Sequence, residues 1–150
     1  MKITLDQLKT LINKPGIETP SGAGNWLQLT LLDVEKGKAN LQMRIRPEMC
    51  NPYGMIHGGM MSLLIDESIG WAIISLESER NYTSLNLMVD FLYAAAVEEE
   101  IEARAEIIRQ GKKIINAEVK VYNRAGTLLA KATSNLIVTS MSKKFYYDSQ

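Results

Sequence analysis

Residues 51–76 read NPYGMIHGGMMSLLIDESIGWAIISL, and the rest of the chain is organised around this stretch. It begins with turn-forming residues, passes through the only histidine, His57, and a glycine pair, and continues as an apolar run. Two adjacent acids, Asp66 and Glu67, interrupt that run. An ionised carboxylate in apolar surroundings is costly unless it is paired, and functional sites are one place where proteins accept that cost. We therefore expect a functional site on a helix that is otherwise buried.

Length and composition indicate one soluble globular domain over residues 1–150. Of the 150 residues, 46% are apolar and 23% are charged, which is usual for a single folded domain. The formal net charge is zero, which argues against a nucleic-acid-binding protein because such proteins usually carry a basic excess. The single cysteine, Cys50, rules out an intramolecular disulfide and fits a reducing cytoplasm.

The sequence contains no segment typical of a signal peptide or a membrane span. The first residues, MKITLDQLKT, lack the long apolar core of a signal peptide. The apolar run over residues 60–76 is short for a membrane span, and its two acids lie where a charge in lipid is expensive. We expect a cytoplasmic protein with no membrane partner.

The spacing of apolar residues before residue 51 predicts a helix, a loop and two strands. Leucines and isoleucines at helical spacing predict a short N-terminal helix within residues 1–16, and turn-forming residues predict a loop over 17–25. Alternation of apolar and polar residues over 27–31 and 39–45 predicts two antiparallel strands joined by a tight turn at 35–38.

Four further strands are predicted after a long helix over Gly58–Leu76. Alternating runs lie at 85–91, 101–107, 117–121 and 130–138. Short links favour antiparallel pairing, and the long helix is the only predicted element able to cover the apolar face of the sheet. We predict an α+β fold in which an antiparallel sheet of about six strands wraps around one central helix. Its core spans residues 26–140, followed by a tail over 141–150.

The start of the predicted helix offers backbone hydrogen-bond donors. Gly58 and Gly59 have no side chains, so a ligand can approach their N–H groups, which lack partners within the helix and carry the positive end of its dipole. This is the chemistry of an oxyanion hole, although a glycine pair taken alone more often serves close packing. His57 can act as a general base, a hydrogen-bond donor or a helix cap. One histidine and one cysteine argue against a metal site.

The paired acids are stronger candidates for chemistry. A carboxylate in partly apolar surroundings gains basicity, as a hydrolytic base or nucleophile requires. We expect Asp66 to have this role, because an ordinary solvated acid on an exposed helical stripe suits Glu67 better. Ser62 precedes Asp66 by one helical turn and gives the run a small polar stripe.

A basic turn is predicted at Arg109-Gln110-Gly111-Lys112-Lys113. Its charges can hold a phosphate group through charge-assisted hydrogen bonds. A solvated hairpin turn with no ligand has the same composition, and for the turn alone that interpretation is favoured.

Taken together, these motifs resemble one protein family. The matching residues are Asn51, Gly54, His57-Gly58-Gly59 and Asp66, followed by Ser84 at the start of a predicted strand. They are similar to the PaaI-type branch of the hotdog-fold acyl-CoA thioesterases. An HGG sequence with an acid nine residues after the histidine is far more specific than either part alone. The resemblance covers about Trp26 to Val138 and implies the hotdog fold, a long helix wrapped in an antiparallel sheet.

The resemblance implies a role for each matching residue. Asp66 is the nucleophile or general base that acts on the thioester, and the Gly58 amide polarises the thioester carbonyl. Asn51 and His57 shape the corner beside the reacting group, and Ser84 orients the attacking water. The residues implied in binding the substrate and its coenzyme A moiety are Gly59, Arg109, Gly111 and Lys112. Coenzyme A is part of the substrate, no metal or other cofactor is implied, and such proteins form dimers that often pair into tetramers.

The spacing between two of these residues predicts self-association independently of the family. Gly58 and Asp66 are eight residues apart in the sequence, which is about 12 Å along a helix axis. A thioester carbonyl held about 3 Å from the Gly58 amide cannot also meet Asp66 of the same helix. If both groups act on one substrate, they come from different chains. We therefore predict a homodimer with two shared active sites related by a two-fold axis.

Hydrolysis of an acyl-CoA thioester to a carboxylic acid and free coenzyme A is the leading functional hypothesis. A hydratase or dehydratase on the same fold is one alternative. It is disfavoured because one branch of such enzymes has a tight D-x-N-P-x-H arrangement, whereas Asn51-Pro52 is followed by a histidine only at position 57. A non-catalytic acyl-CoA-binding protein is another. The sequence is compatible with aryl-acetyl, hydroxybenzoyl and medium-chain acyl groups as the acyl part of the substrate.

Overall fold

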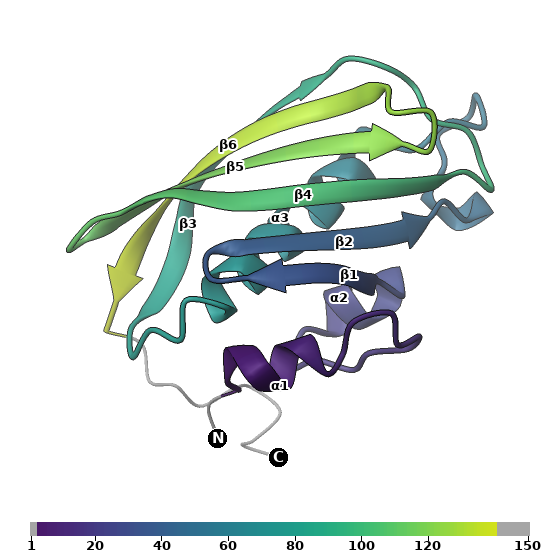
Figure 1. Ribbon diagram of the computed structural model, residues 1–150. Coiled ribbons are helices and arrows are strands. Elements are labelled where there is room, and N and C mark those ends of the chain that lie inside the picture. The colour runs from purple at the N-terminus through teal and green to yellow at the C-terminus, as the bar shows by residue number, and fades with distance from the viewer. Residues whose placement is uncertain (1–2, 141–150) are drawn as a thin grey trace.

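One long helix, α3 (Gly58–Ile74), lies inside a curved six-stranded antiparallel sheet in the computed structural model, which describes residues 3–140 (Figure 1). The strands are β1 (Thr30–Glu35), β2 (Lys38–Arg44), β3 (Asn81–Phe91), β4 (Glu100–Gln110), β5 (Ile114–Asn123) and β6 (Leu128–Thr139). The shorter helices are α1 (Leu5–Lys9), α2 (Gly22–Leu27) and the 3₁₀ turn η1 (Pro47–Met49). The predicted α+β architecture, a sheet around one central helix, is confirmed.

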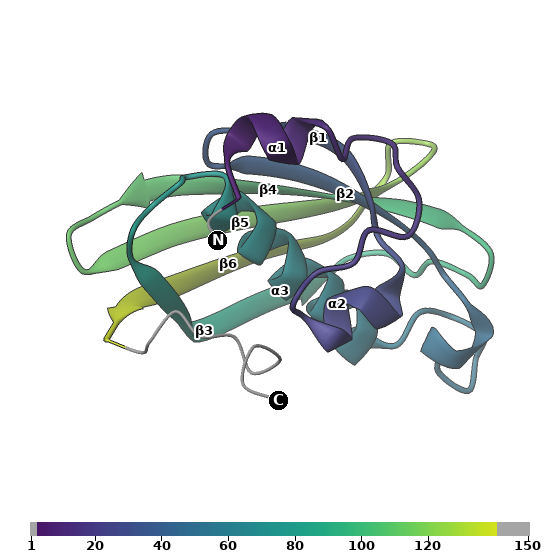
Figure 2. The same ribbon diagram turned by 90° about the horizontal axis from the view of Figure 1, so that it is seen from below.

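The order of the strands across the sheet is β1-β2-β4-β5-β6-β3. After α3 the chain crosses to the far edge, where β3 pairs with β6, and β4 then returns to pair with β2. The two edges of the sheet are therefore β1 and β3. Viewed from below, α1 lies next to β1 and α2 lies against α3 (Figure 2).

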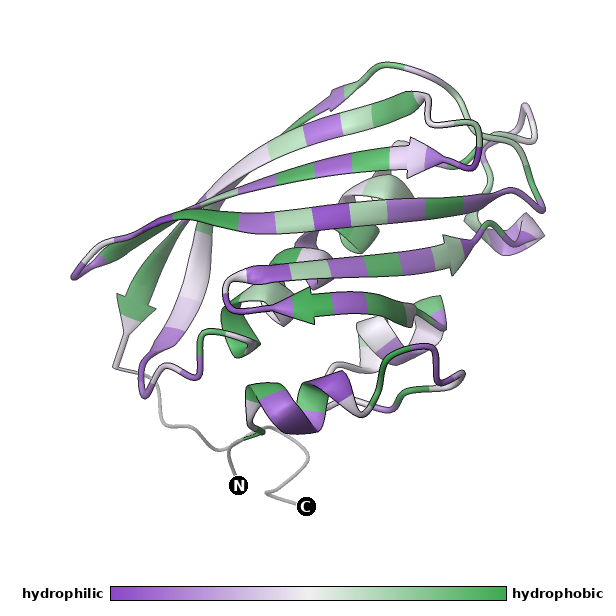
Figure 3. Cartoon of the chain, in the orientation of Figure 1, coloured by the Kyte–Doolittle hydropathy of each residue, from purple (hydrophilic) through white to green (hydrophobic). Residues whose placement is uncertain are grey.

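The core forms between α3 and the concave face of the sheet. Strands alternate hydrophobic and hydrophilic residues along their length, which puts one apolar face toward the helix (Figure 3). On β4 that face carries Ala103 and Ala105, both buried, and their small side chains let α3 approach closely. The buried residues of α3 are Met61, Leu64, Ile65, Ser68, Ile69, Trp71 and Ala72.

The N-terminal part differs from the sequence-based expectation. The predicted loop over 17–25 contains the start of α2, because the Ser21 hydroxyl caps this helix by accepting a hydrogen bond from the Gly24 amide at 3.0 Å. The strand predicted from Leu27 begins only at Thr30, since Leu27 is the last residue of α2 and Gln28 ends that helix with a left-handed φ of 56°. The predicted tail, 141–150, lies outside the described residues.

The edge strand β3 departs from the one-sided alternation expected of it. Three of its large apolar side chains are exposed, at 57% for Leu85, 67% for Met88 and 58% for Phe91, whereas Leu87 and Val89 are partly buried against the core. The register with β6 shifts between Ser84 and Asn86, so Leu85 is the extra residue of a β-bulge. An apolar edge strand with unpaired backbone groups is a template for pairing with another chain.

Between residues 3 and 140, no helix has both the length and the apolar character that crossing a membrane requires.

We predict that Ile65→Ala destabilises the fold strongly, because the Ile65 side chain is 0% exposed at the contact between α3 and the sheet. The free energy of unfolding should fall by about 2–5 kcal/mol in urea denaturation. Ile108→Ala is the matched control, since Ile108 is 52% exposed on β4, and it should change stability by less than about 1 kcal/mol. Equal losses in the two variants would contradict this account of the core.

Candidate active site

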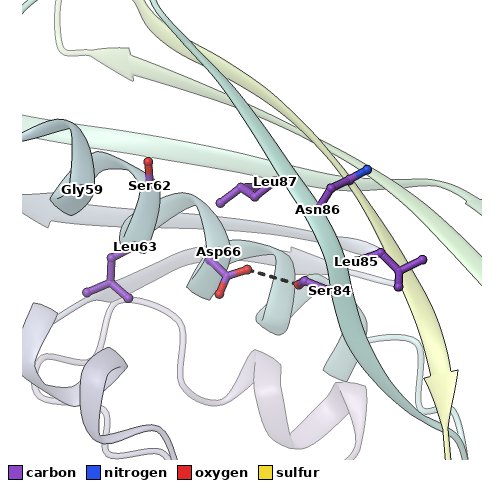
Figure 4. A pocket seen from close by; sticks show the side chains of 8 residues that line it. All are labelled: Gly59, Ser62, Leu63, Asp66, Ser84, Leu85, Asn86 and Leu87. Carbon is purple, nitrogen blue, oxygen red and sulfur yellow. Dashed lines mark hydrogen bonds between the residues drawn. The ribbon is translucent and has the colours of Figure 1, made fainter.

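A groove of about 490 Å³ lies between α3 and the edge strand β3 (Figure 4). The helix contributes Gly59, Ser62, Leu63 and Asp66, and the strand contributes Ser84, Leu85, Asn86 and Leu87. The groove therefore combines an acid and two hydroxyl groups with three leucine side chains. Of these residues, the sequence motifs identified Gly59, Asp66 and Ser84 as site residues. Ser62 was signalled by its spacing of one helical turn from Asp66, but it was not assigned a role.

Asp66 and Ser84 meet in this groove. The Ser84 hydroxyl donates a long hydrogen bond of 3.5 Å to Oδ1 of Asp66, so the strand places a hydroxyl beside the carboxylate (Figure 4). Both residues are exposed within the single chain. A water molecule between them would face a proton acceptor and an orienting hydroxyl together. Among residues 3–140, no three His, Cys, Asp or Glu side chains are grouped as ligands for a metal ion.

The bulge in β3 explains why Ser84 and Leu87, which are an odd number of residues apart, face α3 together. In a regular strand, neighbouring side chains point to opposite faces, whereas the extra residue Leu85 changes the alternation. As a result Ser84 and Leu87, three residues apart, both point toward α3, while Leu85 and Asn86 point away (Figure 4). The bulge is fixed to β6, because the Asn86 side-chain oxygen accepts from the Asn135 amide at 2.9 Å. Sequence alternation alone gave no signal of this irregularity.

At the start of α3, the two glycine amides have different environments. His57 is the N-cap, and its Nδ1 accepts a hydrogen bond from the Gly59 amide at 2.9 Å. Within residues 3–140 the Gly58 amide makes no hydrogen bond, so it alone of the pair remains available to a ligand. Of the three roles considered for His57, the helix cap is the one observed. Because Nδ1 accepts, the neutral imidazole carries its proton on Nε2.

Gly58 also serves close packing, through its other side. A Cβ atom built on Gly58 would lie 3.2 Å from Cζ of Phe91, the last residue of β3. The ring of Phe91 therefore rests against the glycine while the backbone N–H stays free. Gly58 therefore fits both interpretations, a backbone donor for a ligand and a site of close packing, because they concern different faces of one residue.

Asn51 shapes the loop that precedes α3. Its side-chain oxygen accepts hydrogen bonds from the amides of Tyr53 at 2.9 Å and Met55 at 3.2 Å. Its backbone amide donates to the Met55 carbonyl at 2.7 Å, which closes the turn. These contacts fix the position of Asn51 in the loop, while its predicted place beside the reacting group stays a prediction.

The expectation for Glu67 as the solvated acid is wrong. Glu67 is half-buried and accepts a hydrogen bond from the Ser21 hydroxyl at 2.6 Å, whereas Asp66 is exposed at the groove. The same Ser21 oxygen caps α2, and a Cβ on Gly24 would clash with Oε2 of Glu67. Consecutive helical residues point about 100° apart, so turning one acid toward β3 directs the other toward α2. Glu67 thus anchors α2 to α3.

The basic turn lies apart from the groove, between β4 and β5. The Gly111 amide donates to the Ile114 carbonyl at 2.9 Å, and a Cβ on Gly111 would come within 2.8 Å of that oxygen, so this tight turn requires glycine. Arg109 and Lys112 flank it, and both are exposed. The structure thus brings Gly59, Asp66 and Ser84 into one groove and places Arg109, Gly111 and Lys112 at a separate turn.

Comparison with known proteins identifies one family. Residues 53–130 match the sequence profile described as the thioesterase superfamily. Human acyl-coenzyme A thioesterase 13 is 28% identical over 105 residues, which cover 69% of this chain and 75% of that protein.

Solved structures share the fold. A zebrafish thioesterase superfamily member 2 superposes with a TM-score of 0.77 at 24% identity, over 91% of this chain and 99% of that one. The Escherichia coli PaaI protein of the phenylacetic acid degradation operon superposes with a TM-score of 0.73 at 19% identity, over 79% and 88%. The predicted hotdog fold and the resemblance to the PaaI type are confirmed.

We predict that Glu67→Ala loosens α2, because it removes the acceptor of the Ser21 hydroxyl. The free energy of unfolding should fall by about 1–3 kcal/mol, measured by chemical denaturation. Glu67→Gln keeps a side-chain oxygen for Ser21 and should lose less than half as much. If both variants are as stable as the parent protein, Glu67 does not anchor α2.

Proposed function

This chain belongs to the thioesterase superfamily, and we propose that it hydrolyses acyl-coenzyme A thioesters to a carboxylic acid and free coenzyme A. Thioester hydrolysis is the activity of that family, so the predicted class of enzyme is confirmed at this level. The observation that carries the proposal is the Asp66 carboxylate beside the Ser84 hydroxyl in a groove with leucine side chains. The relative named acyl-coenzyme A thioesterase 13 supports coenzyme A as the thiol component.

In the proposed mechanism, Asp66 activates the attack on the thioester carbonyl. As a general base it takes a proton from a water oriented by Ser84, and that water adds to the carbonyl carbon. The Gly58 amide then donates a hydrogen bond to the oxyanion of the tetrahedral intermediate. Collapse of the intermediate breaks the carbon–sulfur bond, and the proton held by Asp66 passes to the departing thiolate. Direct attack by Asp66 through an acyl-enzyme anhydride uses the same groups.

The proposed active site is shared between two chains. Within α3, Gly58 and Asp66 are eight positions apart, about 12 Å along the helix, which is too far for one thioester to meet both. Strand β3 runs antiparallel to α3, since Ser84 lies beside Asp66 and Phe91 lies beside Gly58.

This arrangement supports a two-fold dimer through the β3 edges. If two β3 strands pair antiparallel, the Ser84 end of one strand faces the Phe91 end of the other, so Asp66 of one chain approaches Gly58 of its partner. The exposed Leu85 and Met88 side chains supply apolar surface for such pairing. A further pairing of dimers into a tetramer is proposed on the family resemblance alone.

The structure favours hydrolysis over hydration by His57. A general base needs an unshared lone pair, but Nδ1 of His57 is engaged by the Gly59 amide and Nε2 carries the proton. Asp66 is then the acid–base group of the groove. Leu63 and Leu87 line the same groove and suit an apolar acyl group. We also propose a cytoplasmic location, because Cys50 is the only cysteine in the sequence.

Replacement of Asp66 by asparagine tests the reaction directly. Asp66→Asn should lower kcat for hydrolysis by about 10²–10⁴-fold, because the amide cannot accept the proton. The rate at which free thiol is released from aromatic and aliphatic acyl-CoAs measures kcat. The Asp66→Asn variant should bind coenzyme A as the parent protein does. Glu67→Gln is the control and should retain activity, since Glu67 faces α2. An active Asp66→Asn enzyme would remove Asp66 from the mechanism, and tight acyl-CoA binding without hydrolysis by the parent protein would favour a binding protein.

A pair of substitutions at Gly58 separates its amide from its packing. Proline is favoured at the first position of a helix, and the preceding residue, His57, already has the extended φ of −66° and ψ of 138° that proline requires. Gly58→Pro deletes the N–H and should lower kcat by about 10²–10³-fold. Gly58→Ala keeps the N–H and should lose far less, as its Cβ meets only the edge of the Phe91 ring. Equal losses would assign the effect to packing.

Mixing two inactive variants tests the shared site. A heterodimer of Asp66→Asn and Gly58→Pro chains has one site with both groups intact and one with neither. Random mixing should therefore restore about a quarter of parental activity, because half of the dimers are mixed and each has one good site. Unfolding and refolding the two variants together, with each alone as a control, measures this. If no activity returns although mass analysis detects mixed dimers, each site is built from a single chain.

A further inference from the structure

A group of polar contacts ties the start of β3 to the turn between β4 and β5, away from the catalytic groove. The Arg80 guanidinium donates from Nη1 to the Lys112 carbonyl at 2.5 Å. Beside it, Nε2 of Gln110 lies 3.5 Å from the Tyr82 hydroxyl, which contacts the Ser78 hydroxyl at 3.1 Å. These contacts join two segments that lie about thirty residues apart in the sequence.

Arg80 adds a positive charge to a turn that is already basic. Arg109, Lys112 and Lys113 belong to the turn itself, while Arg80 reaches it from the connection between α3 and β3. The guanidinium of Arg109 lies over Gly111, because a Cβ on that glycine would be 3.0 Å from Nη1 of Arg109. Cations from two separate segments therefore converge on one turn.

The contact between Arg80 and Lys112 prepares the turn for an anion in two ways. The Lys112 carbonyl oxygen carries a partial negative charge that disfavours a nearby phosphate, and the hydrogen bond from the positively charged Arg80 guanidinium offsets it. Arginine has five N–H donors, so one bond to a carbonyl leaves others free for phosphate oxygens. A side chain already held in place also loses less conformational entropy when a ligand binds.

The position of this turn relative to the groove suits an elongated substrate. Arg80 precedes Ser84 by four residues, which is about 13 Å along an extended strand. A substrate with its thioester beside Asp66 and Ser84 can therefore extend along β3 to the basic turn. Coenzyme A has this form, because a long pantetheine arm separates its thiol from its phosphates.

We propose that Arg80 is a phosphate-binding residue for the coenzyme A moiety, acting together with Arg109 and Lys112. The proposal rests on the proposed thioesterase function and extends it to a residue outside the groove and outside the basic turn. Arg80 binds the phosphates directly and also orients the Lys112 carbonyl. It takes no part in breaking the thioester bond.

Two substrates that carry the same acyl group, one on coenzyme A and one on a thiol without phosphates, test the proposal. Arg80→Ala should raise KM for the acyl-CoA by about three- to tenfold, the effect of losing one exposed charge-assisted hydrogen bond, and leave kcat unchanged. The same acyl group on N-acetylcysteamine lacks the phosphates, so kcat/KM for its hydrolysis should not change. The loss with acyl-CoA should shrink at high salt. Arg124→Ala is the control, because Arg124 is an exposed arginine between β5 and β6 and pairs with Glu100.

Each other outcome overturns the proposal. If Arg80→Ala weakens hydrolysis of both substrates equally, Arg80 only supports the fold, and if it changes neither, Arg80 does not meet the phosphates. Calorimetric titration with coenzyme A and with pantetheine separates this result from a failure of the thioesterase function. Even if the parent protein hydrolyses no acyl-CoA, Arg80→Ala should weaken coenzyme A binding and leave pantetheine binding unchanged. Unchanged coenzyme A binding, or none in the parent protein, contradicts the role of Arg80.

Discussion

The packing of α3 on the concave face of the sheet is the contact on which the rest of the structure depends. Small side chains on β4, Ala103 and Ala105, let the helix come close, and the buried Leu64 and Ile65 fix its rotation about its own axis. That rotation determines the directions of the next two residues. Asp66 points to the groove and Glu67 to α2, so the packing of the core also sets the positions of the two acids.

Most of the architecture could be predicted from periodicity, because the strands have one apolar face and the central helix has an apolar run. The directions of Asp66 and Glu67 could not be predicted, since apolar residues are distributed around the whole helix and their spacing does not define which side each acid occupies. Helix α2 was missed because a six-residue helix is too short for a periodic signal, and its serine cap also suits a loop. The bulge at Leu85 was hidden because one extra residue leaves a plausible alternating strand.

The HGG motif combines three functions in adjacent residues. His57 uses its ring to cap the helix through the amide of Gly59, and this leaves the amide of Gly58 unpartnered. The absence of a side chain on Gly58 also makes room for Phe91. A sequence motif indicates that such residues matter, but only the geometry separates the amide that stabilises the helix from the amide that can meet a substrate.

The bulge in β3 has a consequence for the proposed dimer as a whole. Two edge strands that pair through backbone hydrogen bonds can slide past each other, and a slip by one residue moves each strand by about 3.3 Å. In a two-fold dimer such a slip would separate Asp66 from the partner's helix at both reaction centres at once. Because Asn86 and Ser134 hold the bulge against β6, the edge has a fixed irregular shape. In the proposed dimer this fixed irregularity specifies the register of the two β3 strands, and with it the alignment of the two chains.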